Sequence, residues 1–317
     1  MPALLNRRLI FVTGKGGVGK STVASALGLL AARRGLRTIV AELSSQDRVQ
    51  RTFDPLAGTG EDSHPSEHFK EVELAPGLFT ISIDPQHAME EYLRLRIGPL
   101  GHALASSRLF GAFAMATPGM RELLSIGKVW ELAQLERRTH HGAPYDLVIV
   151  DAPATGHGVA AMRTPRMFAE IARVGPIAHQ GRTIAATIAD HAFTAVVAVT
   201  TAEEMPVNET LVLRDALERD QLQLDAVIVN ALYPARFEDG QVATLAAAAQ
   251  RSDSRLARVA LRAALSEHAR AAAQRDQQAR LSDGLGMELI ELPYVFADGF
   301  GKAELDLLTN ALVRGLA

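Results

Sequence analysis

The 317-residue sequence contains no cysteine. This absence excludes a disulfide framework, a cysteine-ligated zinc or iron–sulfur site and a thiol nucleophile. The chain also has little net charge, because 33 Lys and Arg residues oppose 36 Asp and Glu residues to give −3. A near-balanced charge without a basic tail gives no reason to expect a nucleic-acid partner.

Long hydrophobic runs are missing as well. The N-terminal region passes from Arg7 and Arg8 into a short apolar stretch, without the longer apolar segment and cleavage site of a secretion signal. The least charged stretch, residues 97–120, is interrupted by several glycines and prolines, which a membrane span seldom contains. These absences predict a cytoplasmic protein.

Short β-rich runs alternate with longer helical patterns, which is typical of a parallel sheet covered by helices on both faces. Several runs, such as DLVIVD and TAVVAVT, are almost entirely apolar, as expected for strands buried on both faces. The predicted fold is α/β, with a doubly wound, mostly parallel sheet of seven to eight strands in a single domain over residues 1–317. The predicted strands are residues 8–13, 37–42, 78–83, 145–151, 194–200, 224–230 and 287–292.

Helical patterns fill the intervals between these strands. Asp84 as a cap and Pro85 at the first helical position predict a helix start. Segments of about 85–140 and 160–193 have helical apolar content without strands, and they predict a helical subdomain layer at one end of the sheet. The leucines of residues 302–317 are expected to pack on the sheet. The other predicted elements are helices at 20–34, 85–96, 118–138 and 206–219, one or two helices at 239–280, and an exposed loop at 56–70.

The segment GKGGVGKS matches the phosphate-loop pattern GxxxxGK[ST], and it lies between an apolar strand and a helix. Glycines allow backbone N–H groups to approach phosphate oxygens, and the helix N-terminus adds its positive dipole end. We expect Lys20 to reach the β and γ phosphates of ATP and the Ser21 hydroxyl to bind Mg²⁺. The predicted nucleotide-binding residues of this segment are Gly14, Gly16, Gly17, Val18, Gly19, Lys20, Ser21 and Thr22.

Lys15 gives this loop a second lysine, which a glycine turn does not need for structure. GKGGVGKS resembles the deviant phosphate loop of the family that includes the arsenite-pump ATPase, the ATPase that targets tail-anchored membrane proteins, the nitrogenase iron protein and the MinD/ParA spatial regulators. In that family the early lysine crosses a dimer interface to the partner's nucleotide. The resemblance therefore implies a dimer, and the alternative is a solvated surface lysine.

Asp151 ends the apolar run DLVIVD, where a carboxylate can hold Mg²⁺ through water beside the phosphate loop. A terminal aspartate can also be a helix cap. The segment DAPATGH that begins at Asp151 resembles the DTAPTGH switch of the arsenite-pump and tail-anchored-targeting branch. The resemblance makes Thr155, Gly156 and His157 candidates for sensing the γ-phosphate, although His157 could instead be an ordinary helix-start residue.

Other segments resemble the same branch. Residues 117–123 (TPGMREL) look like its PGxxE helix start, and residues 203–210 (EEMPVNET) look like the helix that follows one of its strands. The resemblance implies that Asn230 contacts the adenine edge and that Pro293 borders the adenine. Asparagine after a strand is also an ordinary turn residue.

The sequence departs from the branch after its second strand, where a DPAH tetrad is absent. In the branch, the aspartate of that tetrad orients the attacking water. Glu42 and Asp47 are the remaining candidates, and each has a structural alternative, as a strand-end cap and a helix N-cap respectively. We predict that Glu42 acts here on water or on the Mg²⁺ shell, and the catalytic set is then Lys15, Lys20, Glu42 and Asp151.

Without cysteine, neither the thiol-based metalloid site of the arsenite pump nor the CxxC zinc site of the eukaryotic targeting enzyme can form. The chain has one nucleotide-binding unit, so a two-site assembly needs a homodimer or a heterodimer with a paralogue.

The favoured function is a Mg²⁺- and ATP-dependent dimeric ATPase switch that binds a hydrophobic protein client or a membrane-associated partner. Alternatives are a MinD/ParA-type spatial regulator, an anion or metalloid efflux motor, and a small-molecule kinase. The apolar residues that could contact a client, or form plain core, are Leu109, Phe110, Phe113, Met115 and Met120.

Overall fold

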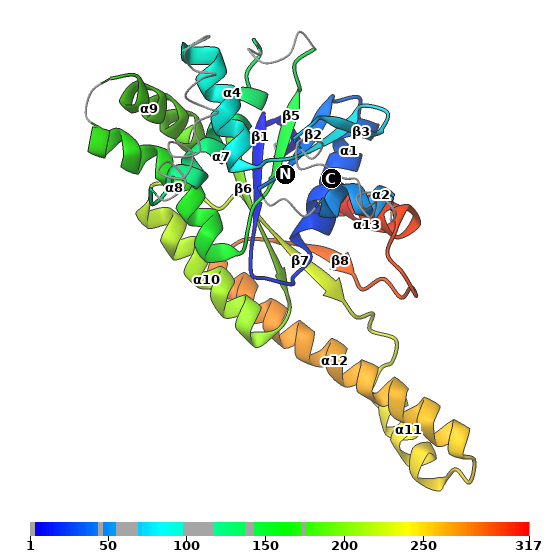
Figure 1. Ribbon diagram of the computed structural model, residues 1–317. Helices are drawn as coiled ribbons and strands as arrows, with labels where there is room; N and C mark the ends of the chain where they lie inside the picture. The colour runs from blue at the N-terminus through cyan, green and yellow to red at the C-terminus, as the bar shows by residue number, and fades with distance from the viewer. Residues whose placement is uncertain are drawn as a thin grey trace.

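The computed structural model describes residues 4–43, 47–54, 69–97, 117–136, 143–172 and 175–316. Within them, eight strands form one sheet with helices on both faces, which confirms the predicted α/β class (Figure 1). The strands are β1 Leu9–Thr13, β2 Thr38–Glu42, β3 Val72–Ala75, β4 Leu78–Ser82, β5 Leu147–Asp151, β6 Thr194–Thr201, β7 Ala226–Leu232 and β8 Leu289–Pro293.

The strand order is β3-β4-β2-β5-β1-β6-β7-β8, and all neighbours are parallel except the β3–β4 pair. The seven predicted strands are confirmed within two residues at each end. The antiparallel edge strand β3 was not predicted, because four residues are too few to show a clear alternation. The Pro76–Gly77 turn between two β-rich runs is the signal that identifies this hairpin.

Strand side chains alternate between two cores. Ile10 and Val12 of β1 face the core under α1 and α13, whereas Leu9 and Phe11 face the core under α7 to α10. All four are almost completely buried. Burial on both faces explains why the central strands are continuous apolar runs in the sequence.

The helices lie close to their predicted positions, with differences at the ends. The predicted cap at Asp84 is confirmed, since its carboxylate accepts hydrogen bonds from the backbone N–H groups of Gln86 and His87 at 2.9 and 3.0 Å. The helices are α1 Lys20–Arg33, α2 Arg48–Phe53, α4 Pro85–Ile97, α7 Met120–Leu132, α8 Thr155–Ala172, α9 Pro176–Ala189, α10 Glu204–Arg219, α11 Asp239–Arg251, α12 Arg255–Leu285 and α13 Lys302–Gly315.

Helix α7 ends earlier than the predicted residue 138. The Arg8 guanidinium donates to the Ala133 carbonyl at 3.2 Å and to the Tyr145 carbonyl at 2.9 Å. A cation at the last carbonyls of a helix favours termination there. Arg8 therefore fixes the end of α7 against the start of β5.

The helical layer comprises α4, α7, α8 and α9, which lie together beyond one face of the sheet (Figure 1). Of the apolar residues considered for client contact, Met120 is described and is partly buried. Leu109, Phe110, Phe113 and Met115 lie outside the described residues, as does most of the predicted loop at 56–70.

Helices α11 and α12 form a hairpin that projects away from the sheet (Figure 1). Helix α12 has 31 residues, which corresponds to a length of about 46 Å. Its C-terminal part packs on α10, where Leu281 is fully buried.

The leucines of α13 pack on the sheet as expected, since Leu305, Leu308 and Leu312 are buried. Among the described residues, no helix combines the length and apolar character needed to cross a bilayer.

Candidate functional site

The loop between β1 and α1 has a backbone that two of its glycines make possible. Gly14 has φ of 144°, and a Cβ atom there would lie 2.1 Å from the Val199 carbonyl oxygen. Gly19 has φ of 92°, and a Cβ there would lie 2.3 Å from the Asn230 side chain. A larger residue would strain the backbone at either position and push this loop away from the neighbouring strands β6 and β7.

Lys20 begins α1 and points back into the loop. Its ammonium donates a hydrogen bond to the Lys15 carbonyl at 2.9 Å. Burial lowers the pKa of Lys20, while the Asp151 carboxylate opposes this effect. The buried ammonium of Lys20 therefore lies in the part of the loop where, in phosphate loops, backbone N–H groups converge on a bound anion.

Ser21 and Asp151, the two residues predicted to hold Mg²⁺, are in direct contact. The Ser21 hydroxyl donates to Asp151 Oδ2 at 2.5 Å. Asp151 Oδ1 is buried and has no hydrogen-bond partner among the described residues. Burial raises the pKa of Asp151, with the Ser21 hydrogen bond and the Lys20 charge acting in the opposite direction.

These atoms form a set of oxygen donors suited to Mg²⁺, which prefers carboxylate, hydroxyl and water oxygens. The unpartnered Oδ1 is an acceptor that a hydrated cation can satisfy. Strand β5 places Asp151 next to Val12 of β1, so the carboxylate lies where the phosphate loop starts.

Glu42 ends β2 directly beside Asp151 in the sheet register. Its two carboxyl oxygens accept hydrogen bonds from the backbone N–H groups of Arg48 and Val49 at 2.9 and 3.1 Å. The side chain is fully buried, and burial together with the nearby Asp151 charge raises the pKa of Glu42 to about 8. Glu42 therefore caps the first turn of α2.

Asp47 occupies the N-cap position of α2 with φ of 47°, but its side chain does not cap the helix. The predicted helix-cap role of Asp47 is wrong in this respect, because the longer side chain of Glu42 reaches the same N–H groups from β2. Asp47 instead accepts a hydrogen bond from the Ser82 hydroxyl. Both candidate carboxylates are thus buried next to each other at the carboxyl ends of β2 and β4.

Lys15 extends from the loop toward α10. Its ammonium lies 2.9 Å from the Glu209 carboxylate, with the two side chains 30% and 35% exposed. Arg48, at the start of α2, lies close enough for its charge to add to the lowering of the Lys20 pKa by burial and to oppose the rise that burial causes in the pKa of Asp151. Arg48 is a candidate phosphate-site cation that the sequence analysis missed, since no motif marks it.

Asn230 and Pro293 lie near the ends of the adjacent strands β7 and β8. The Asn230 amide donates to the Val18 carbonyl at 2.9 Å and so connects β7 to the phosphate loop. Gln274 of α12 supports the next residues, since it donates to the Ala231 carbonyl and accepts from the Tyr233 N–H at 3.0 and 2.8 Å.

Aromatic side chains cluster immediately beyond these strand ends and were also missed. The rings of Tyr233 and Tyr294 stack with centroids 4.8 Å apart, and Phe296 packs edge-on against both. Arg270 lies over Tyr233, and Arg236 lies over Phe296. The sequence signal is an aromatic residue that closely follows each of two strands.

The predicted switch residues lie at the start of α8. Gly156 and His157 are exposed, and the His157 backbone N–H donates to the Ala154 carbonyl at 2.9 Å. Thr155 is the first residue of α8, and its side chain lies outside what the structure describes. His157 is therefore a helix-start residue, and a sensing role for it stays a prediction.

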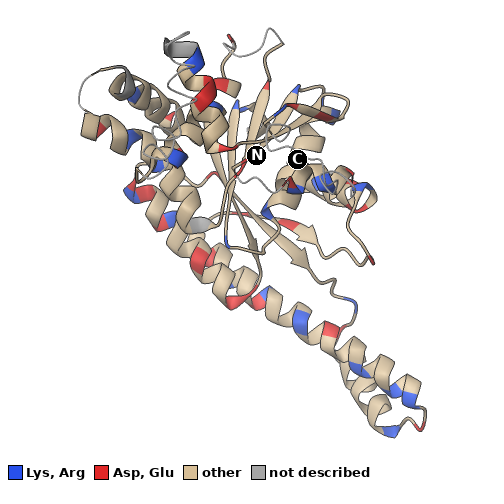
Figure 2. Ribbon diagram, viewed as in Figure 1, with Lys and Arg blue, Asp and Glu red and all other residues tan. Residues whose placement is uncertain are grey.

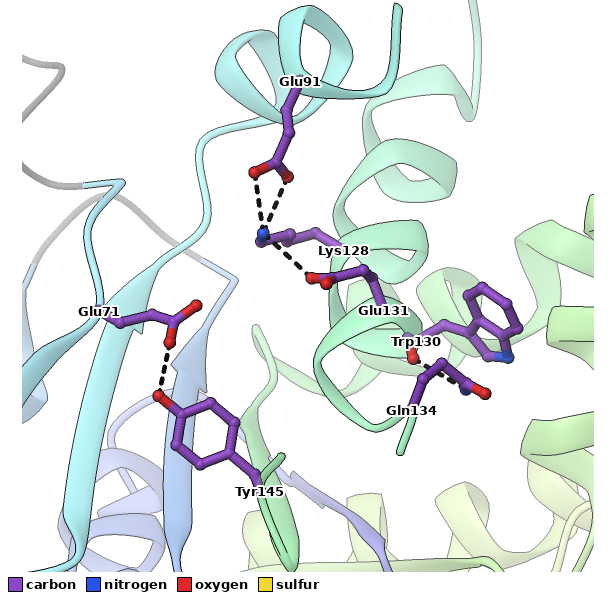
Figure 3. A network of polar contacts seen from close by, with 7 residues as sticks. All are labelled: Glu71, Glu91, Lys128, Trp130, Glu131, Gln134 and Tyr145. Carbon is purple, nitrogen blue, oxygen red and sulfur yellow. Dashed lines mark hydrogen bonds and ion pairs between the residues drawn. The ribbon is translucent and has the colours of Figure 1, made fainter. Parts of the chain in front are cut away.

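A buried ion-pair network joins α4 to α7 within the helical layer (Figure 3). Lys128 of α7 contacts both oxygens of Glu91 of α4 at 2.8 and 3.1 Å, and Glu131 at 3.2 Å. The Lys128 side chain is only 3% exposed. In the same region, the Tyr145 hydroxyl donates to Glu71 at 2.6 Å and links β5 to the edge hairpin.

Comparison with known proteins gives a consistent set of similarities. The family model described as "Anion-transporting ATPase" matches residues 7–180 and 170–260. ATPase BagA of Mycobacterium tuberculosis is 30% identical over 97% of the chain and 93% of its own length. An arsenical pump-driving ATPase of Escherichia coli is 25% identical over 78% of the chain and 43% of that protein. ATPase ASNA1 homolog 1 of Paramecium tetraurelia is 28% identical over 50% of the chain and 44% of its length.

Proposed function

Because the chain belongs to the anion-transporting ATPase family and is an ATPase, we propose that it works as a dimeric switch that couples ATP hydrolysis to binding of a protein client or partner. The observation that carries the nucleotide-binding part of the proposal is the contact of Ser21 with Asp151 beside the buried Lys20. These groups have the charges and donors that a nucleotide triphosphate with Mg²⁺ requires.

In this proposal the phosphates lie in the loop of residues 14–22, where backbone N–H groups and Lys20 bind them. Ser21 would hold the metal directly and Asp151 through water. The ion, when bound, offsets negative charge that develops on the β and γ phosphates. Asp151 also keeps the Ser21 hydroxyl oriented, because its Oδ2 accepts a hydrogen bond from that hydroxyl.

Glu42 is proposed to act on the hydrolytic step from the neighbouring strand. It holds the start of α2, and with it Asp47 and Arg48, next to Asp151. With a pKa of about 8, Glu42 carries its proton in a large part of the molecules at neutral pH. A Glu42→Gln variant that hydrolyses ATP at the wild-type rate would remove Glu42 from the catalytic set.

Lys15 is proposed to contact the nucleotide of a second subunit, either another copy of this chain or a paralogue. Its ion pair with Glu209 holds it within its own chain, and only about 1 kcal/mol or less is expected from such a partly exposed pair. Lys15 can therefore exchange Glu209 for phosphate oxygens at small cost. ATP binding would then close the dimer.

The helical layer of α4, α7, α8 and α9 is the proposed site for the client or partner. Leu135 and Ile171 are exposed large apolar side chains there, and dimer closure would alter access to this layer.

A metalloid-pump role is the second candidate, supported by the name of the arsenical pump-driving relatives. A thiolate metalloid site is excluded by composition, since the chain has no cysteine.

The deciding experiment measures mass in solution by light scattering, with and without a non-hydrolysable ATP analogue, together with phosphate release from ATP. We expect a nucleotide-dependent shift from monomer to dimer that Lys20→Ala abolishes. A mass that stays monomeric with the analogue would contradict the dimeric switch. A phosphorylated small molecule in place of free phosphate would assign the chain to a kinase instead.

A further inference from the structure

The far end of the α11–α12 hairpin is a built structure rather than a loose turn. The Arg258 guanidinium donates to the carbonyls of Ser252 and Asp253 at 2.8 and 3.3 Å, and the Ser254 hydroxyl accepts from the Ala257 N–H at 3.3 Å. These bonds satisfy carbonyls after α11 and the first turn of α12. The hairpin therefore presents a defined surface at its end, far from the sheet (Figure 1).

This end, residues 251–262, carries positive charge on a chain that is negative overall. Its four arginines and one aspartate give a net charge of +3, against −3 for the whole chain. The arginines are Arg251, Arg255, Arg258 and Arg262. Figure 2 shows basic residues gathered at this end of the hairpin.

Three of these arginines form no ion pair in the described part of the chain, and one of them, Arg251, donates a hydrogen bond from Nε to the Ala247 carbonyl at 3.4 Å. Arg251, Arg255 and Arg262 are exposed, and none of them forms an ion pair with any residue that the structure describes. Nearer to the body, by contrast, Arg236 is paired with Glu267 at 2.5 Å. The charges of these three tip arginines are therefore not offset by an ion pair with any described residue.

Two aliphatic side chains lie among these arginines. Leu256 is 80% exposed, the highest value for a large apolar side chain in the described part of the chain, and Val259 is 58% exposed. Their spacing of three places them on one side of α12, and Val259 also shares its side with Arg255 and Arg262. Exposed aliphatic groups flanked by arginines are typical of surfaces that enter the interface of a lipid bilayer.

We propose that residues 251–262, the hairpin tip, dock on an anionic membrane surface. Lipid phosphates would accept hydrogen bonds from Arg251, Arg255 and Arg262, while Leu256 and Val259 would enter the boundary between headgroups and acyl chains. An acidic protein surface would match the charge as well, whereas an anionic bilayer offers both phosphates for the arginines and an apolar region that Leu256 and Val259 can enter. The tip makes a surface contact, and the length of α12 holds the ATPase body away from the bilayer.

The test is flotation of the full chain with vesicles of phosphatidylcholine, with and without phosphatidylglycerol. We expect binding only to the anionic vesicles, weakened by added salt. Arg255→Glu/Arg262→Glu should lower the bound fraction by more than about tenfold, and Leu256→Ser/Val259→Ser by about tenfold. The matched control is Arg34→Glu/Arg275→Glu, which makes the same charge change at exposed positions outside the tip and should bind as wild type.

Every tip variant should keep wild-type ATP hydrolysis and helical content, because the tip is remote from Ser21 and Asp151. Failure of the wild type to float with anionic vesicles overturns the proposal, as does equal loss of binding in the control. Retention on immobilised polyglutamate without vesicle binding would assign the tip to an acidic protein and also overturn it. None of these outcomes depends on dimer formation, so they are distinct from failure of the proposed switch.

Discussion

The ammonium of Lys15 lies 2.9 Å from the carboxylate of Glu209, so the residue expected to reach a second subunit is bound within its own chain. The pair connects the phosphate loop to α10. It competes with any contact that Lys15 makes to another molecule. Removal of the Glu209 charge should therefore favour such contacts.

Glu209→Gln should increase the dimer fraction at a limiting concentration of a non-hydrolysable ATP analogue, by up to about fivefold, since a partly exposed ion pair contributes about 1 kcal/mol or less. Sedimentation velocity measures the fraction. Glu204→Gln is the matched control, because Glu204 is an exposed acid in the first turn of the same helix and, among the described residues, does not pair with the loop. An unchanged dimer fraction in Glu209→Gln would argue that the pair does not restrain Lys15.

Asp151→Asn should reduce Mg²⁺-dependent ATP hydrolysis by at least about a hundredfold, because it removes the buried negative charge beside Ser21. Phosphate release as a function of Mg²⁺ concentration provides the measurement. Asp146→Asn is the control at the other end of the same strand, where the carboxylate accepts a hydrogen bond from the Arg37 N–H. Equal Mg²⁺ dependence in the two variants would exclude Asp151 from the metal site.

Glu42 should make the wild-type protein lose stability as pH rises from 4.5 to about 8. In this range the unfolded chain releases the proton while the folded chain keeps it, so the free energy of unfolding falls with increasing pH. The total decrease in the free energy of unfolding over this pH range is on the order of a few kcal/mol. Glu42→Gln cannot titrate, and denaturant unfolding at several pH values should show a flatter profile. A profile as steep as that of the wild type would contradict the raised pKa.

Asn230→Asp should weaken ATP binding, even though the aspartate side chain has nearly the same shape as that of asparagine. The carboxylate cannot donate to the Val18 carbonyl, so the hydrogen bond between β7 and the phosphate loop is lost at a cost of about 1 kcal/mol. Calorimetric titration with ATP and GTP would measure affinity and base preference. Wild-type affinity for both nucleotides would exclude Asn230 from the binding site.

Lys128→Met should lower the free energy of unfolding by roughly 3–5 kcal/mol, because it leaves Glu91 and Glu131 buried without their cation. Addition of Glu91→Gln and Glu131→Gln should recover much of the loss. Chemical denaturation compares the three proteins. A triple variant no more stable than Lys128→Met would show that the cost arises from packing around the lysine stem.

The sheet and the phosphate loop could be predicted from the sequence because both depend on local patterns. Apolar runs identify buried strands, and the spacing of Gly14, Lys20 and Ser21 defines the loop. Ser21 and Asp151 were each assigned to the metal from their own motifs, but their direct hydrogen bond is a finding of the structure.

Contacts between distant segments were not predictable in the same way. Glu42 caps α2 because β2 and β4 bring it to the N–H groups of Arg48 and Val49, and nothing in the local sequence distinguishes this from a cap by Asp47. The Lys15–Glu209 and Lys128–Glu91 pairs likewise join residues far apart in the chain. Their positions depend on how the helices pack on the sheet.

Helix α12 connects the end of β7, near the phosphate loop, with the distant hairpin tip. Its root at Gln274 is hydrogen-bonded to the backbone at Ala231 and Tyr233, next to Asn230. Its tip at Arg255 lies 19 residues away, about 29 Å along the axis. A tilt of about one tenth of a radian at this root would move the tip by about 3 Å, so a small reorientation of α12 beside β7 would be felt most strongly at the far end of the hairpin.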